Sequence, residues 1–397
     1  MNKIKLSHYT ATTCLGAGLQ PMLAALQQQQ SGLQRCNFPD TDLNTFIGRV
    51  TDLETIQLPQ HLQQFSCRNN HLAYLALQQD QFLTKVTAAK QRYGTQRIAI
   101  LIGTTASGIG QAEQAYQQAS HHHTTLAKTF DYTHTAHPHA TCEFLSEYLQ
   151  LTGPSMMIGT ACSSSSKAFA VAERMLNANI CDAAIVGGID SLCLNTLYGF
   201  NSLELLSNQP CRPCDVNRDG LNIGEAAGFV LLERIEGPPI THSLALLGYG
   251  ESCDAYHMST PHPDGIGAYL AMQHALQTAQ LKPSDVNYIN MHGTASLVND
   301  QVEALAISKL FGNQTLCSST KGWTGHTLGA AGIIETIISC LCLQHNFLPG
   351  CLNCQTIDPK IMNAILLNNK SCKITTILNN SFGFGGNNCS LLLGKIA

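Results

Sequence analysis

One of the 17 cysteines in the chain is placed for chemistry. Cys162 lies in Gly159-Thr160-Ala161-Cys162-Ser163, after an apolar stretch and ahead of a helical pattern. A strand, a tight turn and a helix in this order push the side chain at the turn out of the sheet, as in other nucleophilic enzymes. The positive end of the helix dipole favours a thiolate, so we predict a lowered pKa for this thiol. A buried structural cysteine is the alternative.

Two histidines and a lysine stand at similar junctions. His292 follows a predicted strand, and His326 comes a few residues after Lys321, ahead of a glycine-rich helix start. Sites in α/β folds lie where strands give way to helices, so the fold could bring both imidazoles to Cys162. Satisfied polar histidines near the core are the alternative, and the lysine could simply be exposed.

Other motifs raise the question of a metal. Cys211–Cys214 and Cys351–Cys354 both have C-x-x-C spacing, which would suit zinc if the two pairs met. Nothing marks them as knuckles of one small domain, so we predict no metal and no cofactor. The run His121-His122-His123 is interpreted as a solvated loop, with a metal-binding tract as the alternative.

Composition restricts the class of protein. Apolar residues make up 44% of the 397 residues and charged residues only 12%, which is typical of a well-buried globular chain. The net charge of -4 argues against nucleic-acid binding. The odd number of scattered cysteines favours free thiols in a reducing compartment over a disulfide framework.

No targeting or membrane segment is predicted. Lys3 and Lys5 are followed by polar residues that interrupt any signal-peptide core. We find no apolar run long enough to span a bilayer. The expectation is a cytoplasmic protein without a membrane partner.

Strands and helices are predicted to alternate, which implies a parallel sheet covered by helices on both faces. The expected elements of the first part are a polar helix over 20–34, strands over 97–103, 156–161 and 183–186, a long loop over 120–142, and a helix after Cys162. The helix after Cys162 carries apolar residues at helical spacing.

A second α/β part is predicted after Gly237-Pro238-Pro239. Its strands are expected over 287–291 and 374–378, the latter running into a glycine-rich loop over 379–386. A helix should begin near Asp300, which with Glu303 forms a pair resembling a capping box.

These residues together resemble the elongating β-ketoacyl-[acyl-carrier-protein] synthases of the thiolase superfamily. The motifs occur in the family's order and run through most of the chain. They are Gly159-Thr160-Ala161-Cys162-Ser163, Arg212-Pro213-Cys214-Asp215, Arg218-Asp219-Gly220, Gly224-Glu225, His292-Gly293-Thr294, Lys321, Gly325-His326, and Asn380-Ser381-Phe382-Gly383-Phe384-Gly385-Gly386-Asn387.

The resemblance implies a thiolase-like α/β fold with two related halves, residues 1–237 and 238–397, in layered α-β-α-β-α order. It implies a homodimer, or a heterodimer with a subunit like a chain-length factor. The substrates would arrive on an acyl carrier protein, in fatty acid or aryl-polyene and polyketide biosynthesis.

The resemblance also implies residue roles. Cys162 would hold the acyl group, while His292 and His326 support decarboxylation of malonyl-carrier and stabilise the enolate. Donors in a dry pocket suit such a developing charge, and a thiolate both attacks and leaves well. Lys321 would pair with Glu303 as a support.

Further roles concern binding and gating. The N–H of Phe384 would complete an oxyanion hole with that of Cys162, and the surrounding glycines would let the gate loop move. The residues implied in gating or binding are Thr294 and Ser296 for the pantetheine arm, Ile109 for the acyl pocket, and Gly383 and Gly385 in the loop.

Some positions depart from the family pattern. Pro213-Cys214-Asp215 replaces the usual Pro-Phe-Asp, and Ala295-Ser296 ends a motif that usually ends in threonine. The four serines 163–166 with Lys167, and the segment 317–323, are more similar to ketosynthases of bacterial aryl-polyene clusters.

Two rival functions remain. Non-catalytic chain-length factors lack the nucleophile, whereas Cys162 and both histidines are present here. A degradative thiolase would use a second catalytic cysteine instead of the second histidine.

Overall fold

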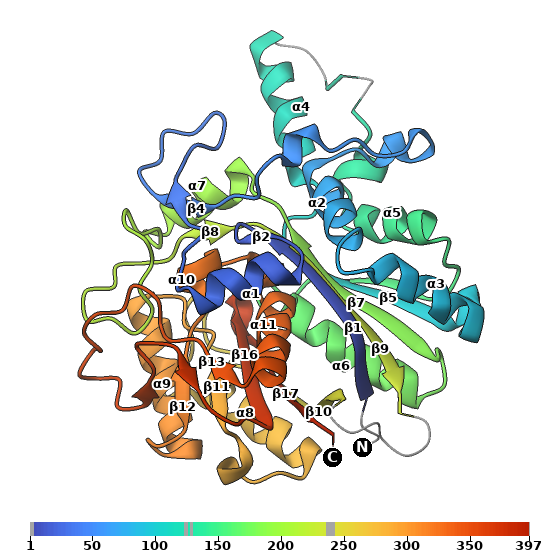
Figure 1. The fold of residues 1–397 in the computed structure, drawn as a ribbon. Coiled ribbons are helices and arrows are strands. Elements are labelled where there is room, and N and C mark those ends of the chain that lie inside the picture. Colours follow the sequence, from blue (N-terminus) through green and yellow to red (C-terminus); the bar gives the residue numbers. More distant parts are fainter. Residues whose placement is uncertain (1–3, 123–125, 128–129, 236–242, 397) are drawn as a thin grey trace.

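The computed structural model describes residues 4–122, 126–127, 130–235 and 243–396, without the side chains of 120–122. Within these ranges a 12-stranded sheet runs through the molecule, in the order β14-β12-β11-β16-β17-β10-β1-β9-β7-β5-β6, with β2 paired to β1. Figure 1 shows how the strands cross the body of the protein.

The sheet contains the same strand order twice. The first unit consists of β1 (Ile4–Thr13), β5 (Ile98–Gly103), β6 (Ser155–Ile158), β7 (Ala183–Asp190) and β9 (Ala226–Arg234). The second consists of β10 (Leu244–Cys253), β11 (Tyr288–Asn290), β12 (Leu316–Ser318), β16 (Thr376–Gly383) and β17 (Asn387–Lys395). Numbered along the chain, both units have the spatial order 3-2-4-5-1. The two halves are therefore related, as predicted.

The sheet is mixed, so the expectation of a purely parallel sheet is wrong. In each unit the first three strands in spatial order are parallel, namely β6, β5 and β7, and β12, β11 and β16. The fourth strand, β9 in the first unit and β17 in the second, runs antiparallel to both of its neighbours, which are β7 and β1 or β16 and β10. Antiparallel pairing of β1 with β10 joins the halves. Apolar strand composition indicates burial on both faces, but it does not distinguish parallel from antiparallel neighbours.

Helices form three layers around the two half-sheets. The inner layer is α6 (Ser164–Asn177) and α11 (Ala331–His345), which contact each other and strands of both units. The outer layer on the first half is α2 (Arg68–Leu77), α3 (Phe82–Tyr93) and α5 (Ala140–Leu149), and on the second half α8 (Ile266–Ala279) and α9 (Leu297–Phe311). The predicted α-β-α-β-α arrangement is confirmed.

The other elements are short or peripheral. α4 projects from the body at the top of Figure 1. The remaining α-helices are α1 (Leu19–Gln27), α4 (Ile109–His122), α7 (Leu194–Ser202) and α10 (Lys321–Thr324). The minor strands are β2 (Gly16–Ala17), β3 (Gln34–Arg35), β4 (Phe46–Gly48), β8 (Ile223–Gly224), β13 (Phe347–Leu348), β14 (Ala364–Ile365) and β15 (Lys370–Ser371).

Several predicted boundaries need correction. The helix expected over 20–34 is the shorter α1, because Ser31 and Gly32 bond to carbonyls of α10. The expected loop over 120–142 contains the end of α4, a π-helical turn (Tyr132–Ala136) and the start of α5. β16 continues to Gly383, past the expected end of the strand, because it pairs with β17 along its whole length. The predicted boundary at 237/238 lies outside the described residues.

Among the residues that the structure describes, one helical stretch is apolar enough to cross a membrane, contrary to the expectation that the chain has none. It is Leu328–His345, which includes α11. Within the protein 89% of this stretch is buried. A helix that is apolar on all sides is as typical of a protein core as of a bilayer, and burial here identifies α11 as the central core helix.

Candidate active site

Cys162 lies in a tight turn between β6 and α6. The residue before it, Ala161, has a φ of +51°, which is costly for a side chain larger than hydrogen. Hydrogen bonds hold the turn in this conformation: the N–H of Ser163 donates to the carbonyl of Thr160, and Ser164 Oγ donates to that of Ala161 at 2.6 Å. The strained turn places the thiol, 6% exposed, at the wall of a cavity.

The serines that follow tie this turn to the second half of the protein. Ser165 Oγ accepts the N–H of Ile333 in α11 at 3.0 Å. Ser166 Oγ hydrogen-bonds to Ser381 Oγ in β16 at 2.7 Å. The serine run therefore positions the nucleophile's helix against α11 in the core and against β16, whose end lines the cavity.

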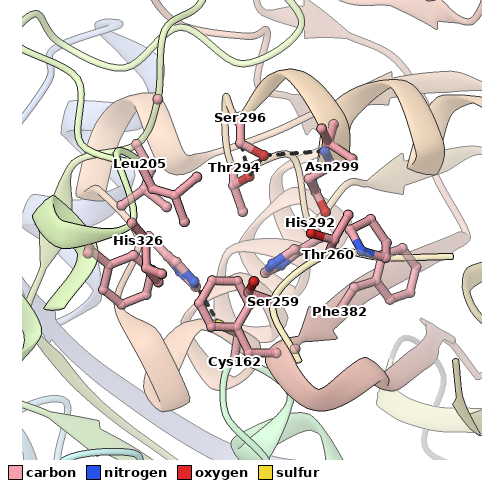
Figure 2. Close-up of a pocket in the computed structure, with 18 of the residues that line it drawn as sticks. Cys162, Leu205, Ser259, Thr260, His292, Thr294, Ser296, Asn299, His326 and Phe382 are labelled. Atoms are coloured by element: carbon pink, nitrogen blue, oxygen red, sulfur yellow. Dashed lines mark hydrogen bonds between the residues drawn. The ribbon is translucent and has the colours of Figure 1, made fainter. Parts of the chain in front are cut away.

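Both predicted histidines reach Cys162. His326 Nε2 lies 2.9 Å from Cys162 Sγ. The rings of His292 and His326 meet edge to face, with centroids 5.3 Å apart. Figure 2 shows the two imidazoles above the sulfur, from opposite sides of the pocket. Four separate stretches of the chain thus converge on one cavity. They carry Cys162, His292, His326 and Phe384.

The backbone around each histidine is anchored to the fold. His326 donates its N–H to the carbonyl of Asn222, and its own carbonyl accepts the N–H of Gly224. These contacts bind the loop from the second half to β8 of the first. His326 Nδ1 is buried and has no hydrogen-bond partner among the described residues.

Lys321 is buried beside His292, but its partner differs from the prediction. Its Nζ lies 2.5 Å from Glu335 Oε1 and 3.4 Å from His292 Nδ1. The ammonium also donates to the carbonyl of His292. The expected pairing with Glu303 is therefore wrong, because α11 presents Glu335 to the lysine while Glu303 bonds elsewhere.

Glu303 supports the loop that carries His292. Its two carboxylate oxygens accept the N–H groups of His292 and Gly293, each at 2.8 Å, and Asn380 Nδ2 donates to it at 3.0 Å. Burial raises the pKa of Glu303 to about 7, against these hydrogen bonds, which lower it. The residue fixes backbone geometry next to the imidazole.

The predicted capping box at Asp300 is wrong. α9 begins at Leu297 with Ser296 as its N-cap, whose Oγ accepts the N–H of Asn299. Asp300 is instead buried and accepts the N–H groups of Cys214 and Ala295. A serine directly before a helix is a better signal for the N-cap than the three-residue spacing of Asp300 and Glu303.

The glycine-rich loop closes one side of the site. The N–H of Phe384 faces the Cys162 thiol and lowers its pKa. The Phe384 ring stacks on Phe200 of α7 at 5.6 Å between centroids. A Cβ on Gly383 would come within 2.8 Å of the carbonyl of Thr160, so only glycine permits this close approach. Gly385, with a φ of +75°, needs the left-handed conformation.

A cavity of about 320 Å³ contains the reacting groups. Its lining includes the predicted residues Cys162, His292, Thr294, Ser296, His326, Gly383 and Phe384. Ile109 and Gly385 are not among the lining residues; Ile109 begins α4, and Gly385 belongs to the glycine-rich loop without lining the cavity. The cavity also contains Phe200, Ser259, Thr260 and Phe382, which sequence reasoning did not single out.

Burial governs the protonation of the reacting groups. It raises the pKa of Cys162 to about 11, although Lys321 and the Phe384 N–H lower it. The prediction of a lowered thiol pKa is therefore wrong. Burial, and next the charge of Lys321, lowers the pKa of both His292 and His326 well below the usual value. The resting pair is a neutral thiol beside a neutral imidazole.

The cluster of Cys162 and the two histidines has donor atoms that could bind a metal ion. Among the described residues, only Cys162, His292 and His326 offer three such ligand atoms within 4.8 Å of one another. The adjacent ammonium of Lys321 disfavours a cation there. The four C-x-x-C cysteines do not form such a group. Of the run His121-His122-His123, the first two residues end α4, while their side chains and all of His123 lie outside the described residues.

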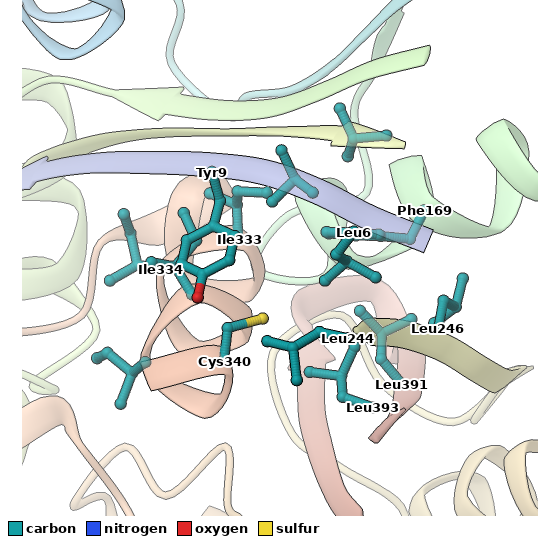
Figure 3. Packing of buried hydrophobic residues seen from close by; sticks show 14 of the residues in the cluster. Leu6, Tyr9, Phe169, Leu244, Leu246, Ile333, Ile334, Cys340, Leu391 and Leu393 are labelled. Atoms are coloured by element: carbon teal, nitrogen blue, oxygen red, sulfur yellow. The ribbon is translucent and has the colours of Figure 1, made fainter. Parts of the chain in front are cut away.

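Two buried acids were missed by the sequence analysis. Glu335 is the only acidic side chain in the largely apolar α11, whose Ile333, Ile334 and Cys340 pack in the core shown in Figure 3. Asp190 ends β7 and accepts N–H groups from Thr105, Ala106 and Gly329, as well as the Thr104 hydroxyl. A lone acid in a buried apolar element was the available signal.

The fold and the site define a class of protein. Two halves of one strand order, with a cysteine at a strained turn beside two histidines from the other half, form a thiolase-like α/β protein. Two family models match the chain: the N-terminal domain of β-ketoacyl synthases over residues 62–237 and the C-terminal domain over 244–355.

Relatives agree with these models. The 3-oxoacyl-[acyl-carrier-protein] synthase 2 of Rhizobium meliloti is 38% identical over 267 residues, 62% of either chain. The protein of the same name from Staphylococcus aureus is 33% identical over 312 residues, 75% of either chain. The chain belongs to the β-ketoacyl synthase family. It spans about 62% of the length of relatives such as the Rhizobium protein.

Solved structures match over the whole chain. A chain from the ketosynthase ApeO in complex with its chain length factor ApeC, from Xenorhabdus doucetiae, has a TM-score of 0.91 and 36% identity, covering 100% of this chain and 98% of that one. A β-ketoacyl synthase from Burkholderia phymatum has a TM-score of 0.87 at 24% identity, with full coverage of both chains, and shows the shared fold.

Proposed function

We propose that the chain is a β-ketoacyl-[acyl-carrier-protein] synthase that holds its acyl group as a thioester on Cys162. The observation that carries the proposal is the 2.9 Å contact between Cys162 Sγ and His326 Nε2, with His292 beside it in the same cavity. The names of the relatives, 3-oxoacyl-[acyl-carrier-protein] synthase, support the same activity.

In the first step Cys162 takes the acyl group. Because the thiol is neutral at rest, its proton passes to His326 Nε2 as the sulfur attacks the carbonyl carbon of the acyl-carrier thioester. The oxyanion accepts hydrogen bonds from the N–H groups of Cys162 and Phe384. The intermediate collapses, and the carrier leaves as a thiolate that takes its proton from solvent, so the proton from Cys162 stays on His326 Nε2.

In the second step malonyl-carrier loses its carboxylate as CO2. The electron pair of the broken bond forms an enolate, whose oxygen accepts hydrogen bonds from His292 and His326. Lys321 donates toward His292 Nδ1, which leaves the ring proton on Nε2 as a donor. The enolate carbon attacks the thioester on Cys162, the new C–C bond forms, and the Cys162 thiolate leaves and takes its proton back from His326 Nε2.

The remaining residues bind or support. Thr294 and Ser296, which line the cavity above the histidines, suit hydrogen bonds to the amides of a pantetheine arm. Glu303 and Lys321 hold His292 in place. Ile109 gates the acyl pocket from the start of α4, and Gly383 and Gly385 give the gate loop its freedom.

The partners are an acyl carrier protein and a second subunit like a chain-length factor. The matched ketosynthase of 36% identity was solved with its chain length factor, which supports a heterodimer. The serines after Cys162 resemble those of aryl-polyene ketosynthases and support a role in building polyene chains. The proposed location of this activity is the cytoplasm. The two halves would divide at 237/238.

The rival functions are less well supported by the site. A chain-length factor needs no nucleophile, yet Cys162 and both histidines are held in contact. A degradative thiolase needs a second cysteine, and Cys162 is the only cysteine among the residues that line the cavity.

Intact-mass spectrometry tests the proposal. The purified chain, with its partner subunit, should gain one acyl mass from acyl-carrier protein and lose it on addition of malonyl-carrier. The Cys162→Ala variant should gain none. His292→Ala should keep acylation and lose decarboxylation. An adduct that persists in Cys162→Ala, with continued condensation, would sink the proposal.

A further inference from the structure

An apolar groove continues from the mouth of the cavity along α9. It is lined by Tyr256, Thr260, Pro261, Pro263, Val298, Gln301, Val302 and Leu305. Thr260, Pro261 and Val298 line both the groove and the cavity, so the two hollows lie side by side and share a wall. Thr260 is labelled at the rim of the cavity in Figure 2.

One face of α9 forms a wall of this groove. Residues 298, 301, 302 and 305 follow helical spacing, so they lie on the same side of the helix. Val298 is 48% exposed, Leu305 40% and Tyr256, on the opposite wall, 56%. A contiguous apolar face that remains open on a globular protein marks an interaction surface.

The carboxylates that line the cavity have no lysine or arginine beside them in the lining of either hollow. On the cavity side Glu204 and Asp219 are exposed and form no ion pair with any residue in the described ranges. A partner whose docking face is acidic would be repelled here, and repulsion between exposed charges is weakened by salt.

We propose that the carrier protein docks in this groove through apolar side chains, and that its surface facing Glu204 and Asp219 is neutral or basic. The inference rests on the proposed function, because the groove opens where a carrier-bound thioester must enter. Val298 and Leu305 would contact apolar residues beside the carrier's phosphopantetheine serine. The two acids would select against carriers with an acidic recognition helix.

Leu305→Glu tests the apolar contact, with Ile180→Glu as its control. Ile180 is an exposed apolar residue just past α6, outside both hollows. Condensation is measured with malonyl and acyl groups on a carrier protein and on N-acetylcysteamine. In Leu305→Glu, kcat/KM for the carrier-bound substrates should fall at least about tenfold relative to the small thioesters, about 1.4 kcal/mol. The control should keep the ratio of the parent protein.

A carrier with an acidic recognition helix, and the same carrier with those carboxylates changed to amides, tests the charge. The amide form should have a several-fold lower KM, and added salt should lower the KM of the acidic form. Glu204→Gln should reduce the difference in KM between the acidic carrier and its amide form.

The outcomes separate the two proposals. No condensation of N-acetylcysteamine thioesters by the parent protein would refute the proposed function itself. Condensation with an unchanged ratio in Leu305→Glu, or with a KM for the acidic carrier that rises with salt, would refute the docking inference alone. A change in subunit assembly in Leu305→Glu would also overturn it, by assigning the groove to another subunit.

Discussion

Lys321 Nζ lies 2.5 Å from Glu335 Oε1, and both side chains are almost fully buried. The same ammonium lies 3.4 Å from His292 Nδ1. A carboxylate from the central helix therefore balances a cation that orients a histidine in the cavity. Either side chain alone would be an uncompensated buried charge, so the ion pair is what allows a charged group next to the reacting residues.

Replacing Glu335 by glutamine should destabilise the protein. The change leaves the buried ammonium of Lys321 without its counter-charge, and breaking such a pair costs about 3–5 kcal/mol. Urea unfolding would measure the loss of unfolding free energy. The double variant Lys321→Met, Glu335→Leu should recover most of it without recovering activity. A loss below about 1 kcal/mol for Glu335→Gln would show that the pair is solvated in solution.

The reactivity of Cys162 should rise steeply with pH. Because burial raises the pKa of the thiol to about 11, alkylation by iodoacetamide should accelerate about tenfold per pH unit between pH 7 and 10. Peptide mass spectrometry can follow Cys162 separately, with the exposed Cys253 as an internal comparison. A plateau already reached at pH 7 would indicate a preformed thiolate and imidazolium, against the neutral resting pair.

The buried histidines should sensitise the fold to acid. The pKa of His326 is lowered in the folded state, so its contribution to stability is present above its ordinary pKa of 6.5 and is lost as pH falls. Below pH 6.5 the unfolding free energy of the parent, minus that of His326→Gln, should fall by about 1.4 kcal/mol per pH unit. Denaturation at pH 7, 6 and 5 measures the difference. A constant difference would mean that His326 titrates normally.

The aromatic stack on the gate loop should affect acylation. Phe200→Ala removes the ring that packs on Phe384, a contact of about 0.5–1.5 kcal/mol. The Phe384 N–H would then be held less firmly, and the rate of acyl transfer to Cys162 should fall by up to about tenfold. Phe200→Tyr keeps the stack and should keep the rate. Equal rates of acyl transfer in the parent, Phe200→Ala and Phe200→Tyr would show that the aromatic stack does not affect the position of the Phe384 N–H.

Metal removal should leave activity intact. Cys162, His292 and His326 are close enough to bind a metal ion, yet the neighbouring Lys321 opposes one. Protein treated with EDTA should condense at the untreated rate, and added zinc should not raise that rate. Activity that is lost with EDTA and restored by zinc would assign a metal to the site.

The sequence was informative where chemistry is local. The turn at Cys162 and the junction at His292 were visible because strand, turn and helix signals are adjacent there, and the family motifs follow them in order. The layered fold and its two related halves also followed from this resemblance. Ser296 as the N-cap of α9 was available from the same local signals but was assigned only to substrate binding.

Tertiary structure decided what depends on distant neighbours. Glu303 was the acid expected beside Lys321, and only the path of α11 through the core places Glu335 there instead. The antiparallel strands β1 and β10 join the halves through pairings that no single segment encodes. The pKa of Cys162 reversed its expected direction because desolvation by the assembled fold outweighs the local charges at the helix start. Spacing determines which groups a segment offers, whereas burial determines which of them can hold a charge.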